Sequence, residues 1–317
     1  MEIVHMPVLL EECIELLGPA SGDSLMVDAT QGEGGHSFAF LSRFPHLRLV
    51  GIDADAAIQA VARERLASFG DRVRFWQGWS HDFFASWPPN EDRPDRILID
   101  LGVSVFHYEK SGRGFSFRKD EALDMRIDPT QGQSARDLVM TLPEEELADL
   151  LYQNADERYS RRIARAIVET RRSHDIDSAR ELAGIVERAV PAVYRHGPVH
   201  AATKTFQALR IVVNGELSRL ESLLESALEV LAIGGRLGVI SFHSIEDRLV
   251  KNFFRERNKD CICPPSVPIC NCGGAREVAL VTRKAVRASP AETRANPPSR
   301  SAQLRVVEKL TARRVLA

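Results

Sequence analysis

Short apolar runs alternate with helical patterns through the first hundred residues of the chain. The runs that predict buried strands are 25–28, 47–53, 73–77 and 97–101. Apolar residues recur at helical spacing over 35–43 and 56–69, between the first three of these runs. Strands that alternate with helices favour a parallel, doubly wound α/β sheet.

The alternation stops after the fourth predicted strand. The segment 106–129 is rich in glycine and charge, and helical patterns then cover 142–152, 157–172 and 178–190. We therefore expect a helical domain, residues 108–199, inserted into a sheet domain that consists of residues 1–107 and 200–317.

The sheet is expected to resume after the insertion. One long helix over 203–230 leads through a Gly-Gly turn to a buried strand over 236–242. Residues 301–308 alternate between polar and apolar, which is typical of an antiparallel edge strand. A short amphipathic helix over 7–17 precedes the first strand.

A glycine-rich turn follows the first predicted strand. The strand ends in Asp28, the turn contains Gly32-Glu33-Gly34-Gly35-His36, and Asp53 ends the next strand. This spacing is typical of a nucleotide-binding βαβ unit, in which the second acid accepts hydrogen bonds from ribose hydroxyls. A pyrophosphate would disfavour acids at Asp28 and Glu33, whereas S-adenosylmethionine carries an ammonium and a sulfonium. The turn therefore favours S-adenosylmethionine over a dinucleotide; a glycine-rich turn without a ligand is the remaining alternative.

Composition indicates a soluble globular protein. The 317 residues carry 42 Lys and Arg against 44 Asp and Glu, and 44% are hydrophobic. No signal-peptide pattern and no apolar stretch of membrane-spanning length appears, so we expect a cytoplasmic protein with no membrane contact. From Arg276 onward basic residues outnumber acidic ones, which is compatible with a polyanionic partner.

Five cysteines are an odd number, which argues against a disulfide framework. Four of them form the pairs Cys261/Cys263 and Cys270/Cys272. This CxC spacing is tighter than the CxxC of ordinary zinc sites, so we expect a reduced loop facing RNA rather than a metal.

Longer motifs resemble one enzyme family over nearly the whole chain, the bacterial 16S rRNA cytosine-N4-methyltransferases. The strings that carry the resemblance are 5–11, 28–37, 100–104, 113–117, 123–126, 202–210, 241–248 and 299–302. It implies a Rossmann-like methyltransferase sheet with an inserted helical domain for substrate recognition. It also implies methyl transfer from S-adenosylmethionine to the N4 amine of one cytosine in the decoding centre of 16S rRNA, within the small ribosomal subunit.

The resemblance also implies cofactor-binding positions. Gly34, Gly35 and His36 are expected at the methionine end of the cofactor, Asp53 at the ribose, and Asp100 nearby. His107 stands where the family has Gln, and Phe106 where it has Pro. The segment 78–83 also departs from the family pattern, so packing on the adenine is open between Trp79, Ser80 and Phe83. For His36 the alternative is an exposed helix start, and for Asp53 a helix N-cap.

Two residues are candidates for catalysis. Asp100 ends the fourth strand, where a carboxylate could accept a hydrogen bond and a proton from the cytosine amine. The alternative is that Asp100 only anchors the cofactor. His243 follows the fifth strand, where it is expected on the rim of the active site, in contact with RNA phosphate or the base; a helix cap at Ser244 is the structural alternative.

Two basic segments are candidates for RNA contact. Arg158, Arg161, Arg162 and Arg165 share one helical face that could grip phosphates, or could simply be solvated. The string Arg113-Gly114-Phe115-Ser116-Phe117 suits a flipped base, with core packing of the two Phe as the alternative.

Other functions remain open at this point. They are methylation of another nucleic-acid amine, a non-catalytic ribosome-assembly or RNA-binding factor, and a dinucleotide-dependent oxidoreductase. A homodimer is compatible with the sequence but not required by it.

Overall fold

The computed structural model describes residues 6–19, 22, 24–197, 199–261, 263 and 276–312. Its contacts divide the chain into two compact units. The sheet unit comprises Met1–Gly102 and Arg219–Ala317, and the helical unit comprises Val103–Ser218. The helical unit extends beyond the predicted insertion at both ends; at the second end this is because α11 (Thr203–Val213) packs on α7 (Glu144–Ala155).

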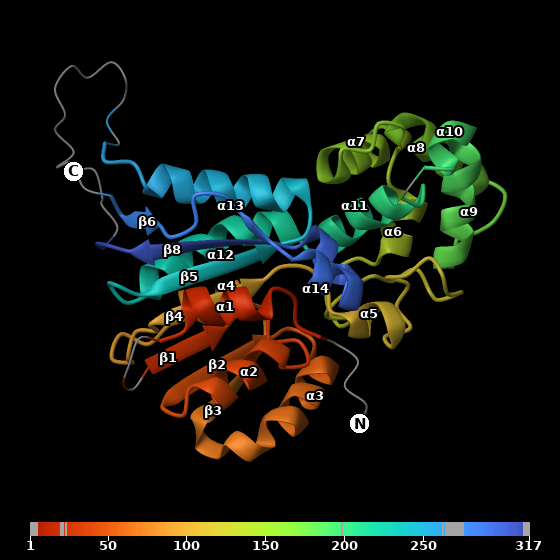
Figure 1. Cartoon of the computed structure of the whole chain (residues 1–317). Coiled ribbons are helices and arrows are strands. Elements are labelled where there is room, and N and C mark those ends of the chain that lie inside the picture. The colour runs from red at the N-terminus through yellow and green to blue at the C-terminus, as the bar shows by residue number, and fades with distance from the viewer. Residues whose placement is uncertain are drawn as a thin grey trace. The chain divides into compact units, whose positions relative to one another are not determined.

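The sheet unit is built on one sheet with the strand order β3-β2-β1-β4-β5-β8-β6, and β7 pairs with β8 (Figure 1). The parallel strands are β1 (Ser24–Asp28), β2 (Leu47–Asp53), β3 (Val73–Gln77), β4 (Arg96–Asp100) and β5 (Arg236–Ser241). The antiparallel strands are β6 (Val278–Leu280), β7 (Val286–Arg287) and β8 (Gln303–Lys309). The predicted doubly wound α/β sheet is confirmed.

Helices bury both faces of this sheet. In β1, Leu25 and Val27 pack into one apolar core and Met26 packs into the other, as the alternation of side chains along a strand requires. The helices that contribute to the Met26 core are α1 (Leu10–Leu17), α2 (Gly35–Arg43) and α3 (Ala56–Leu66). Those that contribute to the other core are α4 (Ser80–Ala85), α12 (Glu216–Val230) and α13 (Ser244–Arg257). The short elements η1 (Ala67–Arg72), α14 (Pro290–Ala295) and η2 (Pro297–Ser301) complete the unit.

The last strand is not at an edge, so that prediction is wrong. β8 pairs with β5 on one side and with β6 and β7 on the other. Leu304, Val306 and Val307 are fully buried in the apolar cores on the two faces of the sheet. The two strands that cover it are three and two residues long, too short to give a periodic signal in the sequence.

The predicted long helix over 203–230 is also wrong, because it is broken near its middle. α11 ends at Val213 and α12 begins at Glu216. Gly215 adopts φ of 57°, a left-handed conformation that ends a helix.

The helical unit consists of seven helices within the residues that the structure describes. Besides α7 and α11 they are α5 (Val105–Glu109), α6 (Ala135–Thr141), α8 (Ser160–Thr170), α9 (Ala179–Ala189) and α10 (Ala192–Arg195). Leu147, Ile163 and Leu182 lie in its apolar core. No helix among the described residues is both long and apolar enough to traverse a bilayer.

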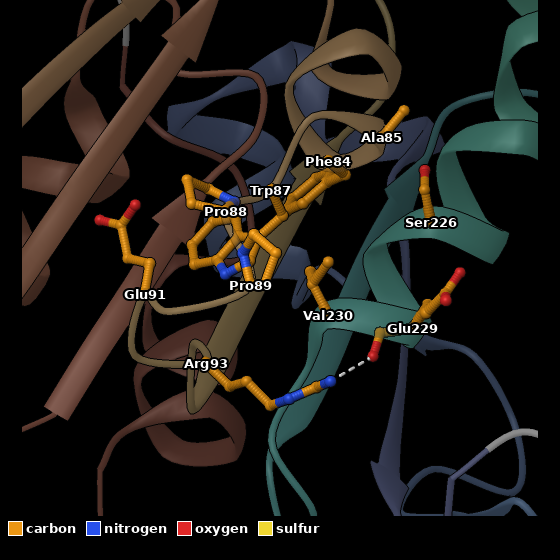
Figure 2. Close-up of a pocket in the computed structure, with 10 residues that line it drawn as sticks. All are labelled: Phe84, Ala85, Trp87, Pro88, Pro89, Glu91, Arg93, Ser226, Glu229 and Val230. Carbon is orange, nitrogen blue, oxygen red and sulfur yellow. Dashed lines mark hydrogen bonds between the residues drawn. The ribbon is translucent and has the colours of Figure 1, made fainter.

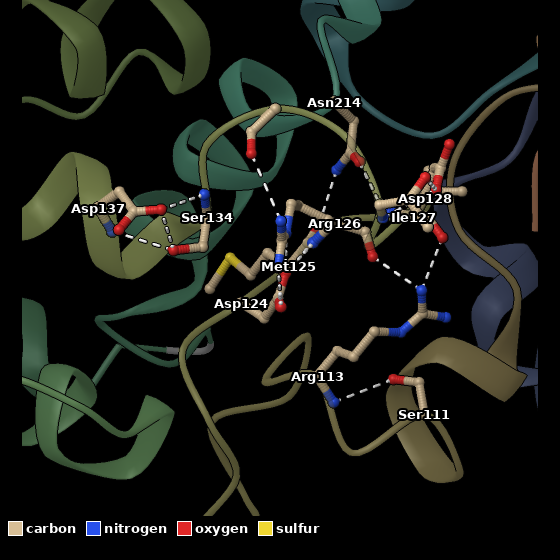
Figure 3. A network of polar contacts seen from close by, with 12 residues as sticks. Ser111, Arg113, Asp124, Met125, Arg126, Ile127, Asp128, Ser134, Asp137 and Asn214 are labelled. Carbon is tan, nitrogen blue, oxygen red and sulfur yellow. Dashed lines mark hydrogen bonds and ion pairs between the residues drawn. The ribbon is translucent and has the colours of Figure 1, made fainter.

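A polar network fixes the non-helical segment before α6 (Figure 3). The Asn214 carboxamide accepts a hydrogen bond from the Ile127 amide and donates one to the Met125 carbonyl, each at 2.8 Å. The Arg113 guanidinium donates to the carbonyls of Arg126 and Ile127 at 2.9 and 2.6 Å. These contacts satisfy backbone groups that no helix or strand satisfies.

A buried lysine ends α12. Lys309 is 3% exposed, and its Nζ donates to the carbonyls of Leu228, Glu229 and Leu231 at 2.7, 2.8 and 2.8 Å. Because Lys309→Met leaves these carbonyls without their donor, we expect a loss of about 3 kcal/mol in the free energy of unfolding, measured by urea denaturation. The exposed Lys284 is the control. A loss below about 1 kcal/mol for Lys309→Met, or an equal loss for Lys284→Met, would contradict the capping role.

Candidate functional site

Three acids meet at one edge of the sheet. Asp28, Asp53 and Asp100 are the last residues of the parallel strands β1, β2 and β4, which are neighbours in the sheet. In doubly wound folds, ligands bind outside this carboxyl edge. The structure therefore brings the acids singled out in the sequence to the edge where a cofactor is expected.

The glycine-rich turn is held rigidly between β1 and α2. Gly34 precedes α2 with φ of 75°, which an L-residue rarely adopts. Gln31 folds over Gly51 in β2, where an added Cβ would lie 1.9 Å from the Gln31 Nε2 atom. These glycines therefore have structural reasons that hold with or without a ligand.

Asp28 is part of the buried framework at this edge of the sheet. It is 1% exposed, and its Oδ2 accepts a hydrogen bond of 2.6 Å from Ser37 Oγ. Burial raises the pKa of Asp28 to about 6, although the Ser37 hydroxyl opposes this shift. Of the two acids expected to favour a cationic ligand, Asp28 contributes only its charge.

Asp53 links the second strand to the glycine turn. Its Oδ2 accepts from the Gly32 amide at 2.8 Å, and its Oδ1 accepts from the Asp55 amide at 2.9 Å. The N-cap of α3 is Asp55, whose Oδ1 accepts from the Ala57 amide at 2.9 Å. The N-cap alternative for Asp53 is therefore wrong, and its carboxylate is oriented by two backbone amides at the tip of β2.

His36 is buried, so the alternative of an exposed helix start is wrong. It is 6% exposed, and its Nε2 lies 2.9 Å from the Val8 carbonyl oxygen. Burial lowers the pKa of His36 to about 4, so the ring is neutral at pH 7. A carbonyl can only accept, so Nε2 carries the proton and Nδ1 carries a lone pair. That Nδ1 lies 3.8 Å from Asp100 Oδ2.

Asp100 has unused hydrogen-bonding capacity. Its backbone amide donates to Thr30 Oγ1 at 2.6 Å, and 17% of its side chain is exposed. Burial raises its pKa well above the usual range, and the charges of Asp28 and Glu246 add to the shift. Among the described residues, nothing donates a hydrogen bond to its Oδ1.

Unsatisfied oxygens at this edge share one chemical character. Gln31 Oε1, Glu33 Oε2 and Asp100 Oδ1 are buried acceptors without a donor in the part of the chain that the structure describes. Buried acceptors are costly unless a donor reaches them. A ligand that brings N–H donors and positive charge fits this set, and an anionic pyrophosphate does not.

The three candidates for packing on adenine differ in their contacts. The Ser80 hydroxyl donates to the Ala29 carbonyl, and the Phe83 ring packs against Trp76 and Trp87 with centroids 5.3 and 5.4 Å apart. Trp79 instead has the Arg219 guanidinium 3.9 Å from its ring centroid. Since Gly78, its neighbour, donates to the Asp53 carbonyl at 2.9 Å, Trp79 lies close to the tip of β2. No sequence pattern predicted the contact with Arg219.

His243 has the capping role that was expected of Ser244. It is the N-cap of α13, and its Nδ1 accepts from the Glu246 amide at 3.4 Å. Glu246 Oε2 accepts in return from the His243 amide at 3.4 Å, and it also accepts from the Phe242 amide at 2.9 Å. The predicted cap at Ser244 is wrong, and a catalytic role for His243 stays a prediction.

Two predicted site segments lie in the helical unit. His107 is 4% exposed, and its ring packs on Phe106 and Phe115 with centroids 5.8 and 5.1 Å apart. Its contact with a cofactor stays a prediction. Phe115 is 4% exposed within the core, which confirms core packing for this ring; contact of the string 113–117 with a flipped base stays a prediction.

A cavity of about 220 Å³ lies elsewhere in the sheet unit (Figure 2). Trp87, Pro88 and Pro89 form one wall, and the Arg93 guanidinium donates to the Glu229 carbonyl at 2.7 Å across it. Its lining residues precede β4 and β5, so the cavity lies toward the amino ends of these strands, away from the acids.

Of the cysteine pairs, Cys270 and Cys272 lie outside the described residues, so the metal prediction is not tested.

Comparison with known proteins agrees with this geometry. Residues 2–310 match the MraW methylase family. A protein of Treponema denticola, "Ribosomal RNA small subunit methyltransferase H", is 56% identical over 313 residues, which cover 99% of each chain. Proteins of the same name from Syntrophobacter fumaroxidans and Treponema pallidum are 47% and 44% identical; the alignments cover 96% of both chains for the first, and 97% of this chain and 93% of the relative for the second. The resemblance read from the motifs is confirmed: the chain belongs to the MraW methylase family.

Proposed function

We propose that this protein transfers a methyl group from S-adenosylmethionine to the N4 amine of one cytosine in the decoding centre of 16S rRNA. The observation that carries the proposal is the carboxyl edge of the sheet, where Asp100 offers a buried oxygen with no donor among the described residues. The names of the relatives support a small-subunit rRNA substrate. The N4 position and the decoding centre come from the family resemblance.

The cofactor would be held along the tips of β1 to β4. Gly34, Gly35 and His36 would contact its methionine end, and Asp53 would accept hydrogen bonds from the ribose hydroxyls. Trp79 is the favoured wall for the adenine, because it stands at the tip of β3 outside the aromatic cluster of Phe83. Ser80 and His107 remain proposed cofactor contacts.

Methylation of the N4 amine requires that the amine lose one proton. S-adenosylmethionine supplies an electrophilic methyl group on a sulfonium. The N4 lone pair of cytosine is delocalised into the ring, so a hydrogen bond from the amine to Asp100 would make the nitrogen more nucleophilic. Asp100 would take up the proton that the amine loses, since its raised pKa makes it a stronger base than an exposed carboxylate.

The polar character of His36 suits a positioning role. Its Nε2–H is used by the Val8 carbonyl, so Nδ1 can only accept a hydrogen bond. Facing Asp100 at 3.8 Å, this nitrogen would share a donor from a bound ligand with the carboxylate.

A cytoplasmic location, with the small subunit as partner, follows from the proposed substrate.

Transfer of labelled methyl groups from S-adenosylmethionine tests the proposal. We expect label in unmodified small ribosomal subunits, and little in duplex DNA or in subunits that already carry the modification. Label that appears only in DNA or another RNA would replace the substrate. Cofactor binding without any transfer would favour a non-catalytic assembly factor, and binding of NAD but not S-adenosylmethionine would favour an oxidoreductase.

A further inference from the structure

One face of α8 in the helical unit carries exposed arginines and nothing apolar. The helix buries Ile163 and Ile167 in the core, while Arg161, Arg162 and Arg165 are exposed on the other side. Arg161, Arg162 and Arg165 share one helical face, and Arg158 lies in the turn just before the helix. We call these four residues the arginine stripe.

The charge of the stripe is poorly compensated. Arg161 and Arg162 have no acidic partner among the described residues, and Arg165 reaches Glu144 only at 3.4 Å between two exposed side chains. Exposed ion pairs of this kind contribute about 0–1 kcal/mol. Several acids of the unit pair with other arginines, namely Asp175 and Asp177 with Arg136, Asp124 with Arg126 and Glu216 with Arg210. One exposed acid of α8, Glu169, lies seven residues after Arg162 and therefore on the same face as the stripe. Because four arginines stand against this one acid, the stripe keeps a net positive charge.

An aromatic pair stands at one end of the stripe. The Tyr159 and Tyr194 rings have centroids 4.9 Å apart in an edge-to-face arrangement. The Arg158 guanidinium lies 5.0 and 4.8 Å from the two ring centroids. These distances are within the range of cation–π contacts. Cation and aromatic faces are thus combined at a surface, since Arg158 is exposed and both tyrosines are partly exposed.

A buried carboxylate fixes this pair. Glu157 is fully buried; it accepts from the Tyr194 hydroxyl and from the Tyr159 amide, each at 2.9 Å. Burial, followed by the hydrogen bond to Glu157, raises the pKa of Tyr194 to about 12. Burying a carboxylate is costly unless it is hydrogen-bonded. Here the hydrogen bonds of Glu157 position the two tyrosines whose rings lie against the Arg158 guanidinium. The aromatic pair is therefore a rigid feature of the surface.

We propose that the arginine stripe and the Tyr159–Tyr194 pair form an RNA-binding surface, with arginines on phosphates and a tyrosine face against an unstacked base. The inference rests on the proposed function and adds to it the part of the helical unit that grips the rRNA. One guanidinium group can donate two parallel hydrogen bonds to a phosphate group. Single-stranded RNA is recognised by stacking of its bases on aromatic rings and guanidinium planes. An acidic protein partner would use the arginines but would leave the aromatic pair without a function.

The test compares two double variants that remove the same charge. Arg161→Ala/Arg162→Ala removes the two unpaired arginines of the stripe, and Arg180→Ala/Arg188→Ala removes two exposed arginines of α9. Binding to unmodified small subunits is measured over a range of salt concentrations, together with KM and kcat for methyl transfer. We expect the stripe variant to bind on the order of tenfold more weakly and its salt slope to fall by about 1.5. Its KM should rise by the same factor, with kcat unchanged.

A third variant tests the aromatic part. Tyr194→Leu removes a partly exposed ring and is expected to weaken binding several-fold without changing the salt slope, because no phosphate contact is lost. Circular dichroism melting confirms that each variant is folded. The proposal would be overturned by equal losses in the stripe and α9 variants, or by an unchanged KM in the stripe variant. It would also be overturned if the stripe variant changed only self-association, measured by sedimentation.

Failure of the inference can be told apart from failure of the proposed function. Wild-type protein that binds no S-adenosylmethionine and transfers no methyl group would refute the function, whatever the RNA measurements show. Wild-type protein that methylates normally, beside a stripe variant that binds RNA as tightly, would refute only the surface.

Discussion

Asp100→Asn is expected to reduce methyl transfer at saturating S-adenosylmethionine by roughly 10²–10⁴-fold, the usual contribution of a positioned general base. Asparagine keeps the shape of the side chain but accepts a proton poorly and bears no charge. The reason lies in the geometry of β4, which ends at Asp100 with one buried oxygen that accepts nothing from the described residues. Turnover is measured as label incorporated into unmodified small subunits, and cofactor affinity is measured separately by calorimetry.

The alternative role makes a different prediction for the same variant. If Asp100 only anchors the cofactor, enough S-adenosylmethionine restores the full rate, and the catalytic role is lost. Asp71→Asn, at an exposed acid of the same unit, is the matched control and should leave both quantities unchanged.

Stability provides an independent reading of Asp100. Burial and the charges of Asp28 and Glu246 raise its pKa, so the folded state binds a proton more tightly than the unfolded state does. Ionised Asp100 therefore destabilises the fold, and the wild type gains stability as pH falls through the raised pKa. We expect Asp100→Asn to melt at the same or a higher temperature than the wild type at pH 7, and to lose this advantage near pH 4. A lower melting temperature at pH 7 would show that the carboxylate has a structural partner.

Asp53→Ala is expected to weaken S-adenosylmethionine binding by about 10²-fold. Two hydrogen bonds from ribose hydroxyls to a carboxylate contribute about 3 kcal/mol or more together, which corresponds to that factor. Part of the loss comes from the glycine turn, because the Gly32 amide also donates to Asp53 Oδ2 at 2.8 Å. Calorimetric titration with S-adenosylmethionine measures the change.

Asp55 provides the matched control for this prediction. It is an acid two residues further on, and it caps α3 without lying at the strand tip. Asp55→Ala should cost about 1 kcal/mol of stability and leave cofactor affinity within a few-fold of wild type. Equal affinity losses for both variants would mean that Asp53 acts only by ordering the loop.

Much of the fold could be predicted because the pattern is strong where the sheet is parallel. β2 and β3 begin and end where the apolar runs do, and α2 coincides with its predicted range. The predictions fail at one glycine with a left-handed backbone conformation and at one strand whose neighbours are set by tertiary contacts. Gly215 divides a continuous apolar pattern into two helices, and β8 becomes an interior strand through two very short neighbours. Neither event leaves a periodic trace in the sequence.

The candidate site was predictable in position but not in detail. Strand-end acids and glycines are visible as residue types, so Asp53 and Asp100 could be named in advance. The sequence could not show that the Ser37 hydroxyl donates a hydrogen bond to Asp28, or that the neutral His36 faces Asp100. Nor could it show that Arg219 lies on Trp79, because contacts between distant segments exist only in the folded chain.

The most direct test of the central claim is the identity of the methylated nucleoside. Unmodified small subunits are incubated with the protein and labelled S-adenosylmethionine, the rRNA is digested, and the nucleosides are separated and weighed by mass spectrometry. The account predicts label in N4-methylcytidine, formed at least about 10²-fold more slowly with Asp100→Asn. Label in a carbon-methylated cytidine or a ribose-methylated nucleoside would contradict it, because neither product uses an exocyclic amine.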